Sequence, residues 1–446
     1  MELLFTIIIF IQLVIAIIIL KETLHPLVIL KSVVFLGSIG LLIFHKEWGI
    51  NISAMTVFIL STAIMWVDLG FAFTMMIANT SNRGNLYLKN NNNLQNKKYE
   101  QKILNISTNK AILSTILILI TIIVYLSIGS DYIVGSDNIK EFTRNLMIYK
   151  GETRSNGAVD LGVWTYIILV CRMLGVVYLY FSVKEYMTNG WSKKVSILLM
   201  PSIAVFIMGY ILGIRSILVI YSLIIVFVAY KIQVKSDKYE NARDKKILEI
   251  KYLIMGILCI GLIFSYFFIA GKLAGKIDPN EGLNNIAIYL SGGIGAFDNV
   301  YKNLTFTSDL FGQQTFRIIY KALNVIPLFD FETQNTISTT IYGTGGFRTN
   351  VYTANLNFMA DFGYMGVILC NMLIGMFHGF LYNKSKNEID AGVWTVLNAF
   401  FMMPLVSYLN AEKYFAAMPL NAICFIAIYL LIKLPILYKR RVRWIK

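Results

Sequence analysis

Charged residues are scarce in this sequence, at 15% of its 446 residues, while hydrophobic residues reach 57%. A soluble globular domain has about 25% charged and about 45–50% apolar residues, so this composition excludes an ordinary soluble protein. The uncharged runs 3–20, 111–128 and 252–271 are each long enough to cross the hydrocarbon core of a membrane as a helix. The sequence therefore predicts an all-α polytopic membrane protein.

Cysteine and histidine are also rare, with four and three residues respectively. The cysteines all fall inside apolar runs, which argues against a disulfide framework and favours small core side chains. The sequence has no HExxH motif, no DxD motif and no Cys/His cluster, so we predict neither a metal nor a cofactor. With the orientation given below, His45 is the one histidine on the outer side, and an outward-facing histidine base is not expected.

Eleven apolar segments are predicted to span the membrane, at about 3–20, 26–44, 52–78, 111–129, 161–181, 195–213, 216–230, 252–271, 363–382, 392–409 and 414–432. The first lacks a basic start and a clear cleavage site, so we predict a retained helix and no signal peptide. Lysine and arginine gather in 79–110, in 231–251 and after residue 432. The positive-inside rule places these segments in the cytoplasm, with the N-terminus outside and the C-terminus inside.

This orientation leaves two longer outer segments, at 130–160 and at about 272–362. The longer of these segments lies between two groups of predicted helices. The chain is therefore divided into a first bundle of eight helices (1–271), the large outer loop (272–362), and three last helices with a basic tail (363–446). The many aromatic and aliphatic residues of this outer loop predict that it is ordered. Within it we predict a helix at 283–304 interrupted at Gly292–Gly293, and an amphipathic helix at 309–323. The second helix either lies on the membrane surface or packs in an outer cap.

A few charges fall within the predicted spans, where ionisable groups are rare and costly. Arg172 and Asp68 lie near the middle of theirs, and either pair with each other or line a substrate cavity. Lys31 is close enough to the inner end of its span to snorkel. Arg215, at the tight outer turn 213–216, either reaches lipid phosphate or binds a substrate phosphate through its two-pronged guanidinium.

Three short segments of the predicted outer turn and outer loop occur together in this sequence. Gly213-Ile-Arg215-Ser216 lies at the tight outer turn, and YLSGGIGAFDN begins at Tyr289 in the large loop. NVYT (350–353) then precedes DFGYMG (361–366), which leads into the next span. This set resembles the Wzy-type oligosaccharide repeat unit polymerases of bacterial O-antigen and capsule synthesis, with the 361–366 segment the most specific.

The resemblance implies a glycosyltransferase of the bacterial inner (plasma) membrane that works on the outer face. Its substrates would be undecaprenyl-diphosphate-linked oligosaccharides within the membrane lipids. The growing glycan would move from its carrier to a new lipid-linked unit. A chain-length regulator is a candidate partner, and no nucleic acid is expected. The resemblance implies no specific sugar or linkage.

Chemistry assigns roles to the outer residues. The acceptor hydroxyl needs a general base, and Asp361 is our first candidate because it lies where the loop meets the membrane. Asp330, Glu332 and Asp298 are the further carboxylates. Arginines that neutralise the diphosphate leaving group would remove the need for a metal; the candidates are Arg215, Arg348, Arg317 and Arg172. Aromatic rings that could stack on sugars are Tyr289, Tyr342 and Tyr352.

Simpler roles remain open for these residues. Asp361 could cap the helix that follows it, Arg348 could be a solvated loop cation, and the tyrosines could belong to an interfacial aromatic belt. Two other functions also remain open. A lipid-linked oligosaccharide flippase or other transporter would use the charges within the spans, although such a protein is expected to have short outer loops. An O-antigen ligase is the related enzyme, and the lack of a suitable outer histidine disfavours it by family analogy only.

Overall fold

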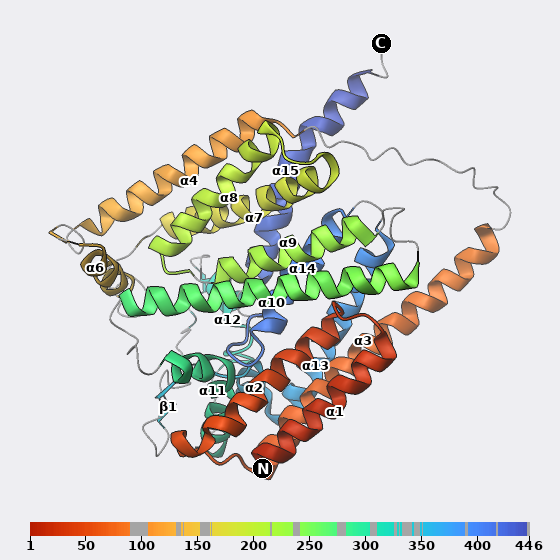
Figure 1. Ribbon diagram of the computed structural model, residues 1–446, viewed down its shortest axis with the longest axis vertical. Helices are drawn as coiled ribbons and strands as arrows, with labels where there is room; N and C mark the ends of the chain where they lie inside the picture. The colour runs from red at the N-terminus through yellow and green to blue at the C-terminus, as the bar shows by residue number, and fades with distance from the viewer. Residues whose placement is uncertain are drawn as a thin grey trace. The chain divides into compact units, whose positions relative to one another are not determined.

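The computed structural model describes residues 1–89, 106–130, 135–136, 138–151, 161, 163–214, 216–234, 241–273, 282–303, 310–324, 328–329, 331, 341–342, 348–349, 351–388, 391–415 and 418–443. Its helices are α1 (Glu2–Leu20), α2 (Pro26–Trp48), α3 (Ala54–Lys89), α4 (Thr108–Ile128), α6 (Ile139–Gly151), α7 (Trp164–Asn189), α8 (Lys193–Ile211), α9 (Ser216–Val234), α10 (Ala242–Leu273), α11 (Gly282–Asn303), α12 (Arg317–Leu323), α13 (Ala354–Asn387), α14 (Val393–Val406) and α15 (Met418–Arg443) (Figure 1). The strands β1 (Ile341–Tyr342) and β2 (Arg348–Thr349) pair antiparallel.

The prediction of an all-α polytopic membrane protein is confirmed. Among the described residues, eight helices are long and apolar enough to cross a membrane: α1, α2, α3 (over Ala54–Thr80), α4, α7, α8, α9 and α13. The predicted span 252–271 lies within α10, and the last two predicted spans correspond to the shorter apolar helix α14 and the apolar part of α15. The side of the membrane on which each terminus lies, and the divisions at 271 and 362, stay predictions.

The chain folds into two compact units, each assembled from separated stretches. Unit 1 comprises Met1–Lys98, Leu283–Glu388 and Phe401–Pro419. Its main helix pair is α3 with α13, which run side by side (Figure 1). Glycines bring the two backbones together: a Cβ at Gly375 would lie 2.0 Å from the carbonyl oxygen of Val67, and one at Gly70 would lie 2.0 Å from that of Met372. Small residues permit such close helix approach in membranes.

Unit 2 comprises Tyr99–Gly282, Ile389–Phe400 and Leu420–Lys446. Helix α7 packs against α4, α8 and α9. At the centre of this packing, Ser202 Oγ donates to the carbonyl of Gly175 at 2.9 Å, and the Tyr221 hydroxyl donates to the carbonyl of Ser202 at 3.2 Å. Stacked rings add to the core, including Phe181 with Tyr429 at 5.7 Å between centroids. The unit is therefore a helix bundle held by aromatic packing and side-chain-to-backbone hydrogen bonds.

The predicted break in the first loop helix is wrong, because α11 runs through Gly292–Gly293 without interruption. The role of glycine here is to allow close packing, not to make the helix flexible. A Cβ at Gly293 would lie 1.8 Å from the carbonyl oxygen of Leu409, and one at Gly37 would lie 2.8 Å from that of Leu290. The glycines therefore let α11 press against α2 and the 407–410 segment, which fixes the first part of the outer loop on unit 1.

Two other boundaries in this region differ from the predictions. The amphipathic helix predicted at 309–323 exists only as α12, because residues 310–316 form a series of turns with Gly312 in the left-handed region (φ 65°). The span predicted to begin at 363 belongs to a helix that begins at Ala354 and kinks at Gly363, whose φ is 62°. Only glycine adopts that backbone conformation without strain. The kink separates a short first segment of α13 from a longer second segment.

Candidate functional site

Asp361 lies on α13 two residues before the kink at Gly363, and it is half-buried. Its Oδ1 accepts the backbone N–H of Gln314 at 3.1 Å, and its Oδ2 accepts that of Thr315 at 2.6 Å. The carboxylate thus organises the 310–316 turn of the outer loop. The alternative in which Asp361 caps the helix that follows it is not seen, because both of its carboxylate oxygens accept amides of the 310–316 turn.

Aromatic rings clamp the same turn onto α13. The ring of Phe362 lies 5.0 Å from that of Phe311 and 6.0 Å from that of Phe316. Phe316 also meets Phe415 edge-on at 5.7 Å, and Phe415 meets Phe358 at 5.9 Å. Such tilted and edge-on pairs are favourable arrangements of aromatic rings. The position of Asp361 is therefore fixed from both sides, by backbone amides and by the aromatic cluster.

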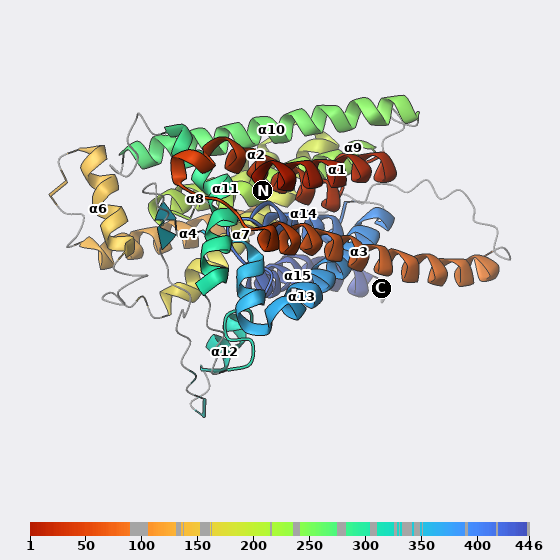
Figure 2. The same cartoon turned by 90° about the horizontal axis from the view of Figure 1, so that it is seen from below.

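Two further predicted site residues lie on segments next to Asp361. Arg317 is half-buried and begins α12, directly after the turn that Asp361 holds. Helix α12 is labelled in Figure 2. Tyr352 lies on the stretch that leads into α13, where its backbone N–H donates to the carbonyl of Asn410 at 3.3 Å. Burial raises the pKa of Tyr352 above its usual value, so the residue stays a neutral phenol that can donate a hydrogen bond. Tyr289 lies on α11 of the same unit with an exposed side chain.

The other predicted site residues lie on other elements or outside the described residues. Tyr342 and Arg348 are direct partners in the register of β1 and β2, so their backbones lie side by side. Arg172 is half-buried on α7 of unit 2. Arg215, Asp330 and Glu332 lie outside the described residues.

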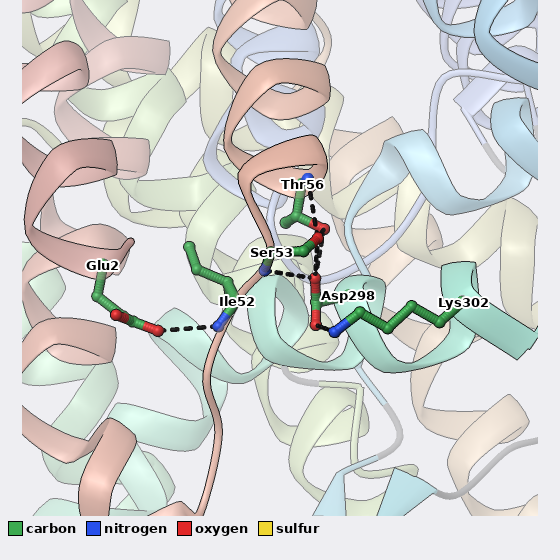
Figure 3. Close-up of polar contacts among 6 residues, drawn as sticks. All are labelled: Glu2, Ile52, Ser53, Thr56, Asp298 and Lys302. Carbon is green, nitrogen blue, oxygen red and sulfur yellow. Dashed lines mark hydrogen bonds and ion pairs between the residues drawn. The ribbon is translucent and has the colours of Figure 1, made fainter.

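Asp298, a further carboxylate candidate, joins α11 to the start of α3 (Figure 3). Its Oδ1 accepts the Ser53 backbone N–H at 2.8 Å and the hydroxyls of Ser53 and Thr56 at 2.6 and 2.7 Å. Its Oδ2 accepts Lys302 Nζ at 2.6 Å. Burial pushes the pKa of Asp298 upward, but the hydrogen bonds from Lys302, Ser53 and Thr56 outweigh it, so the pKa lies below its ordinary value. Ser53 caps α3, because its Oγ accepts the Thr56 backbone N–H at 3.2 Å, and Asp298 holds this cap from α11.

A second carboxylate supports the same connection. Glu2 Oε1 accepts the backbone N–H of Ile52 at 2.8 Å, one residue before the contact with Asp298 (Figure 3). The segment between α2 and α3 is thus held by carboxylates from two distant parts of the chain. Helix α11 is consequently tied to the N-terminal helices.

We predict that Asp298→Asn lowers the free energy of unfolding by about 1–3 kcal/mol, because buried donors lose a charged acceptor. The folded pKa lies below the ordinary 3.8, so the charge stabilises the fold at pH values above 3.8. That stabilisation is lost as the pH falls through the folded pKa. Thermal unfolding in nanodiscs should show a gap between wild type and variant that is full at neutral pH and shrinks below pH 4. Asp244→Asn, which removes only an exposed hydrogen bond, is the control; an equal gap at every pH would contradict the prediction.

A buried polar network that the sequence analysis missed spans the kink of α13. Asn371 Nδ2, after the kink, donates to Asn355 Oδ1, before it, at 2.7 Å. Asn355 Nδ2 donates to the Tyr408 hydroxyl at 2.9 Å, and that hydroxyl donates to Asn371 Oδ1 at 2.7 Å. All three side chains are buried. The network fixes the angle between the two segments of α13 and hence the direction in which Asp361 is presented; two asparagines in an apolar context were its only sequence signal.

Comparison of the chain with protein-family models, with curated proteins and with solved structures finds no match. Any function therefore has to be argued from the residues and their geometry, together with the resemblance of the short outer segments. Among the described residues, no group of three or more His, Cys, Asp or Glu side chains is arranged to hold a metal ion.

The charges within the first spans form a pair of their own. Lys31 Nζ on α2 lies 2.8 and 2.7 Å from the two carboxylate oxygens of Asp68 on α3. Asp68 therefore pairs with Lys31 and not, as one alternative had it, with Arg172. The prediction that Lys31 snorkels is also wrong, since its side chain is only 5% exposed and points to Asp68. A buried charge is tolerated when it is paired in this way.

Proposed function

We propose that this chain is a polymerase that transfers a growing glycan from undecaprenyl diphosphate to a lipid-linked oligosaccharide repeat unit at the outer face of a bacterial inner membrane. The single observation that carries the proposal is the position of Asp361. It lies on α13 two residues before the kink, and its two carboxylate oxygens bind backbone amides of the 310–316 turn. The resemblance of residues 361–366 to the Wzy-type polymerases supports the same function.

The carboxylate retains the capacity that a general base needs. An ionised carboxylate has about four lone-pair sites, and the two backbone amides occupy two of them. The acceptor hydroxyl would give its proton to Asp361 while its oxygen bonds to the anomeric carbon of the donor. The bond from that carbon to the diphosphate oxygen breaks, and the polyprenyl diphosphate leaves with the electron pair. Each atom and charge is then accounted for without a further reactant.

Arginines supply the charge that the leaving diphosphate requires. Arg317 begins α12 directly after the turn that Asp361 binds, so its backbone is fixed relative to the base. A guanidinium can bind phosphate oxygens in two-pronged fashion and stabilise the charge that develops as the bond breaks. Arg215 and Arg348 are proposed to assist it, while Tyr352 and Tyr289 are proposed to contact sugar rings. A chain-length regulator remains the proposed protein partner.

Deletion of the gene, followed by electrophoresis of the surface glycan, tests the proposal. We expect the long chains to disappear and a product with one repeat to persist, and the wild-type gene to restore the ladder. Loss of all surface glycan with lipid-linked units trapped inside would instead indicate a flippase. Long chains that accumulate on the carrier without transfer to the final acceptor would indicate an O-antigen ligase.

The Lys31–Asp68 pair is the one observation that favours a transporter as the second candidate, because ionisable groups within spans often mark a transport path. We predict that the pair is structural. Asp68→Asn alone should destabilise the protein, by less than the about 3–5 kcal/mol typical of a fully buried pair, since Asp68 is 33% exposed.

The double variant Lys31→Met with Asp68→Asn should recover much of that stability, because no buried charge remains without a partner. Thermal unfolding of the two variants measures the difference, and glycan ladders report their function. A stable double variant that no longer delivers repeat units to the outer face would contradict the structural role and support transport.

A further inference from the structure

The described residues of the outer loop at 310–324 and 328–329 carry apolar side chains that no other described part of the chain covers. Phe311 is 77% exposed, Leu328 is 88% exposed and Ile319 is 52% exposed. Phe329 beside Leu328 is exposed as well. Exposed apolar groups of this size, gathered in one short stretch, mark a surface that meets something apolar. We call this group the apolar tip, consisting of Phe311, Ile319, Leu328 and Phe329.

Hydrogen bonds and ring contacts support the described residues next to the apolar tip. Asn324 Nδ2 donates to the carbonyl of Phe331 at 2.8 Å, and Phe331 N donates to Asn324 Oδ1 at 2.9 Å. The Phe331 ring lies 5.2 Å from that of Tyr320 and 5.6 Å from that of Phe329. The Tyr320 hydroxyl donates to the carbonyl of Phe311, which links α12 to the 310–316 turn. These contacts hold the outward direction of the side chains.

The location of the apolar tip is given by its connection to α13. The ring of Phe311 lies 5.0 Å from that of Phe362, the residue before the kink. Beyond the kink, Met365, Leu369 and Leu373 are exposed at four-residue spacing. One face of a helix that is long and apolar enough to cross a membrane is expected to meet lipid along such a row. Phe311 therefore lies at the level where the lipid-facing row of α13 begins.

The charge of the stretch fits the same location. Arg317 lies between Phe311 and Ile319 and can stay at the surface while the neighbouring apolar side chains enter lipid. Apolar side chains combined with a cation are typical of segments that bind at the interface of membranes with anionic lipids. A glycan would instead need polar partners, which these four side chains do not supply.

We infer that the apolar tip, formed by Phe311, Ile319, Leu328 and Phe329, inserts into the membrane leaflet beside α13. The leaflet would thereby hold the 310–316 turn, and with it the Asp361 carboxylate, at the level of the lipid headgroups. The inference rests on exposure and position alone, so it stands or falls independently of the proposed glycosyl transfer.

Spin labels test the insertion directly in the full-length protein reconstituted into vesicles of phosphatidylethanolamine and phosphatidylglycerol. Leu328→Cys and Phe311→Cys would each carry a nitroxide, with the signal of the unsubstituted protein subtracted for its native cysteines. Asn299→Cys on α11 is the matched control, because this polar position is exposed in the same outer loop. Power saturation compares the collision of each label with oxygen, which concentrates in lipid, and with a water-soluble nickel chelate.

We expect the labels at 328 and 311 to collide more with oxygen than with the chelate, and the label at 299 to show the reverse. The oxygen preference should persist when Asp361→Asn is present, which separates the inference from the proposed chemistry. If the labels at 328 and 311 were as accessible to the chelate as the label at 299, the apolar tip would not be in lipid and the inference would be overturned. Immobilised labels shielded from both reagents would indicate a protein partner and would overturn it equally.

Discussion

Asp361→Asn is expected to eliminate long glycan chains while the product with a single repeat persists. An amide cannot take the proton of the acceptor hydroxyl, and removal of a general base typically costs about 10²–10⁴-fold in rate. A polymer that needs many successive transfers would be lost at the upper end of that range. The measurement is a glycan ladder from cells in which the variant replaces the wild-type gene, together with an immunoblot for the amount of protein in the membrane.

The structure also defines what a purely structural role for Asp361 would look like. Asparagine keeps only one acceptor oxygen, so the variant can hold the amide of Gln314 or that of Thr315 through its side-chain carbonyl, but loses the second charged acceptor. If the loss of this hydrogen bond alone caused the loss of long chains, the thermal stability of the protein and its amount in the membrane would fall together with its activity. Asp298→Asn is the matched comparison, because its carboxylate has four donors and is expected to affect stability first. Normal long chains in Asp361→Asn would exclude the catalytic role.

Gly375→Ala is expected to be among the most destabilising single substitutions in the chain. The added methyl group would lie 2.0 Å from the carbonyl oxygen and 2.8 Å from the carbonyl carbon of Val67, which are backbone atoms of α3 and cannot rotate away. Overpacking in a tight core costs about 1–3 kcal/mol or more, and here α3 and α13 would have to separate. Thermal unfolding of the purified protein in nanodiscs should show a lower transition temperature and reduced expression.

Gly256→Ala provides the matched control for that experiment. Gly256 lies within α10, where an added methyl group meets nothing within 4 Å. There the substitution should be neutral or stabilising by about 0.5–1 kcal/mol, since alanine loses less backbone freedom than glycine in a helix. Opposite signs at the two positions are expected. Equal tolerance at both would mean that α3 and α13 are not in close contact.

The long apolar helices could be predicted from the sequence because the membrane imposes length and hydropathy directly on each segment. The local structure of the outer loop was harder to predict than these helices. A pair of glycines such as 292–293 looks the same in the sequence whether it breaks a helix or lets a helix approach a neighbour. The neighbour is the Leu409 carbonyl, which lies more than a hundred residues further along the chain. Pattern reasoning about 283–304 therefore chose the wrong role for them.

The candidate site shows the same limit in more detail. Asp361 could be singled out because a carboxylate before a long apolar run is unusual. Its partners could not, because they are backbone amides of Gln314 and Thr315, and a backbone amide carries no sequence signal. Lys31 and Asp68 were each recognised as charges within spans, yet their pairing depends on how α2 and α3 rotate, which neither segment specifies alone.

Reconstitution tests the central claim most directly. The purified protein would be incorporated into vesicles with the undecaprenyl-diphosphate-linked repeat units of its own host and no other enzyme, and the products would be separated by size. We expect wild-type protein to produce a ladder of longer lipid-linked chains together with free undecaprenyl diphosphate, and Asp361→Asn to leave the units unchanged. Folded wild-type protein that never elongates these units, or that moves them across the bilayer without joining them, would contradict the claim that the chain is a glycan polymerase.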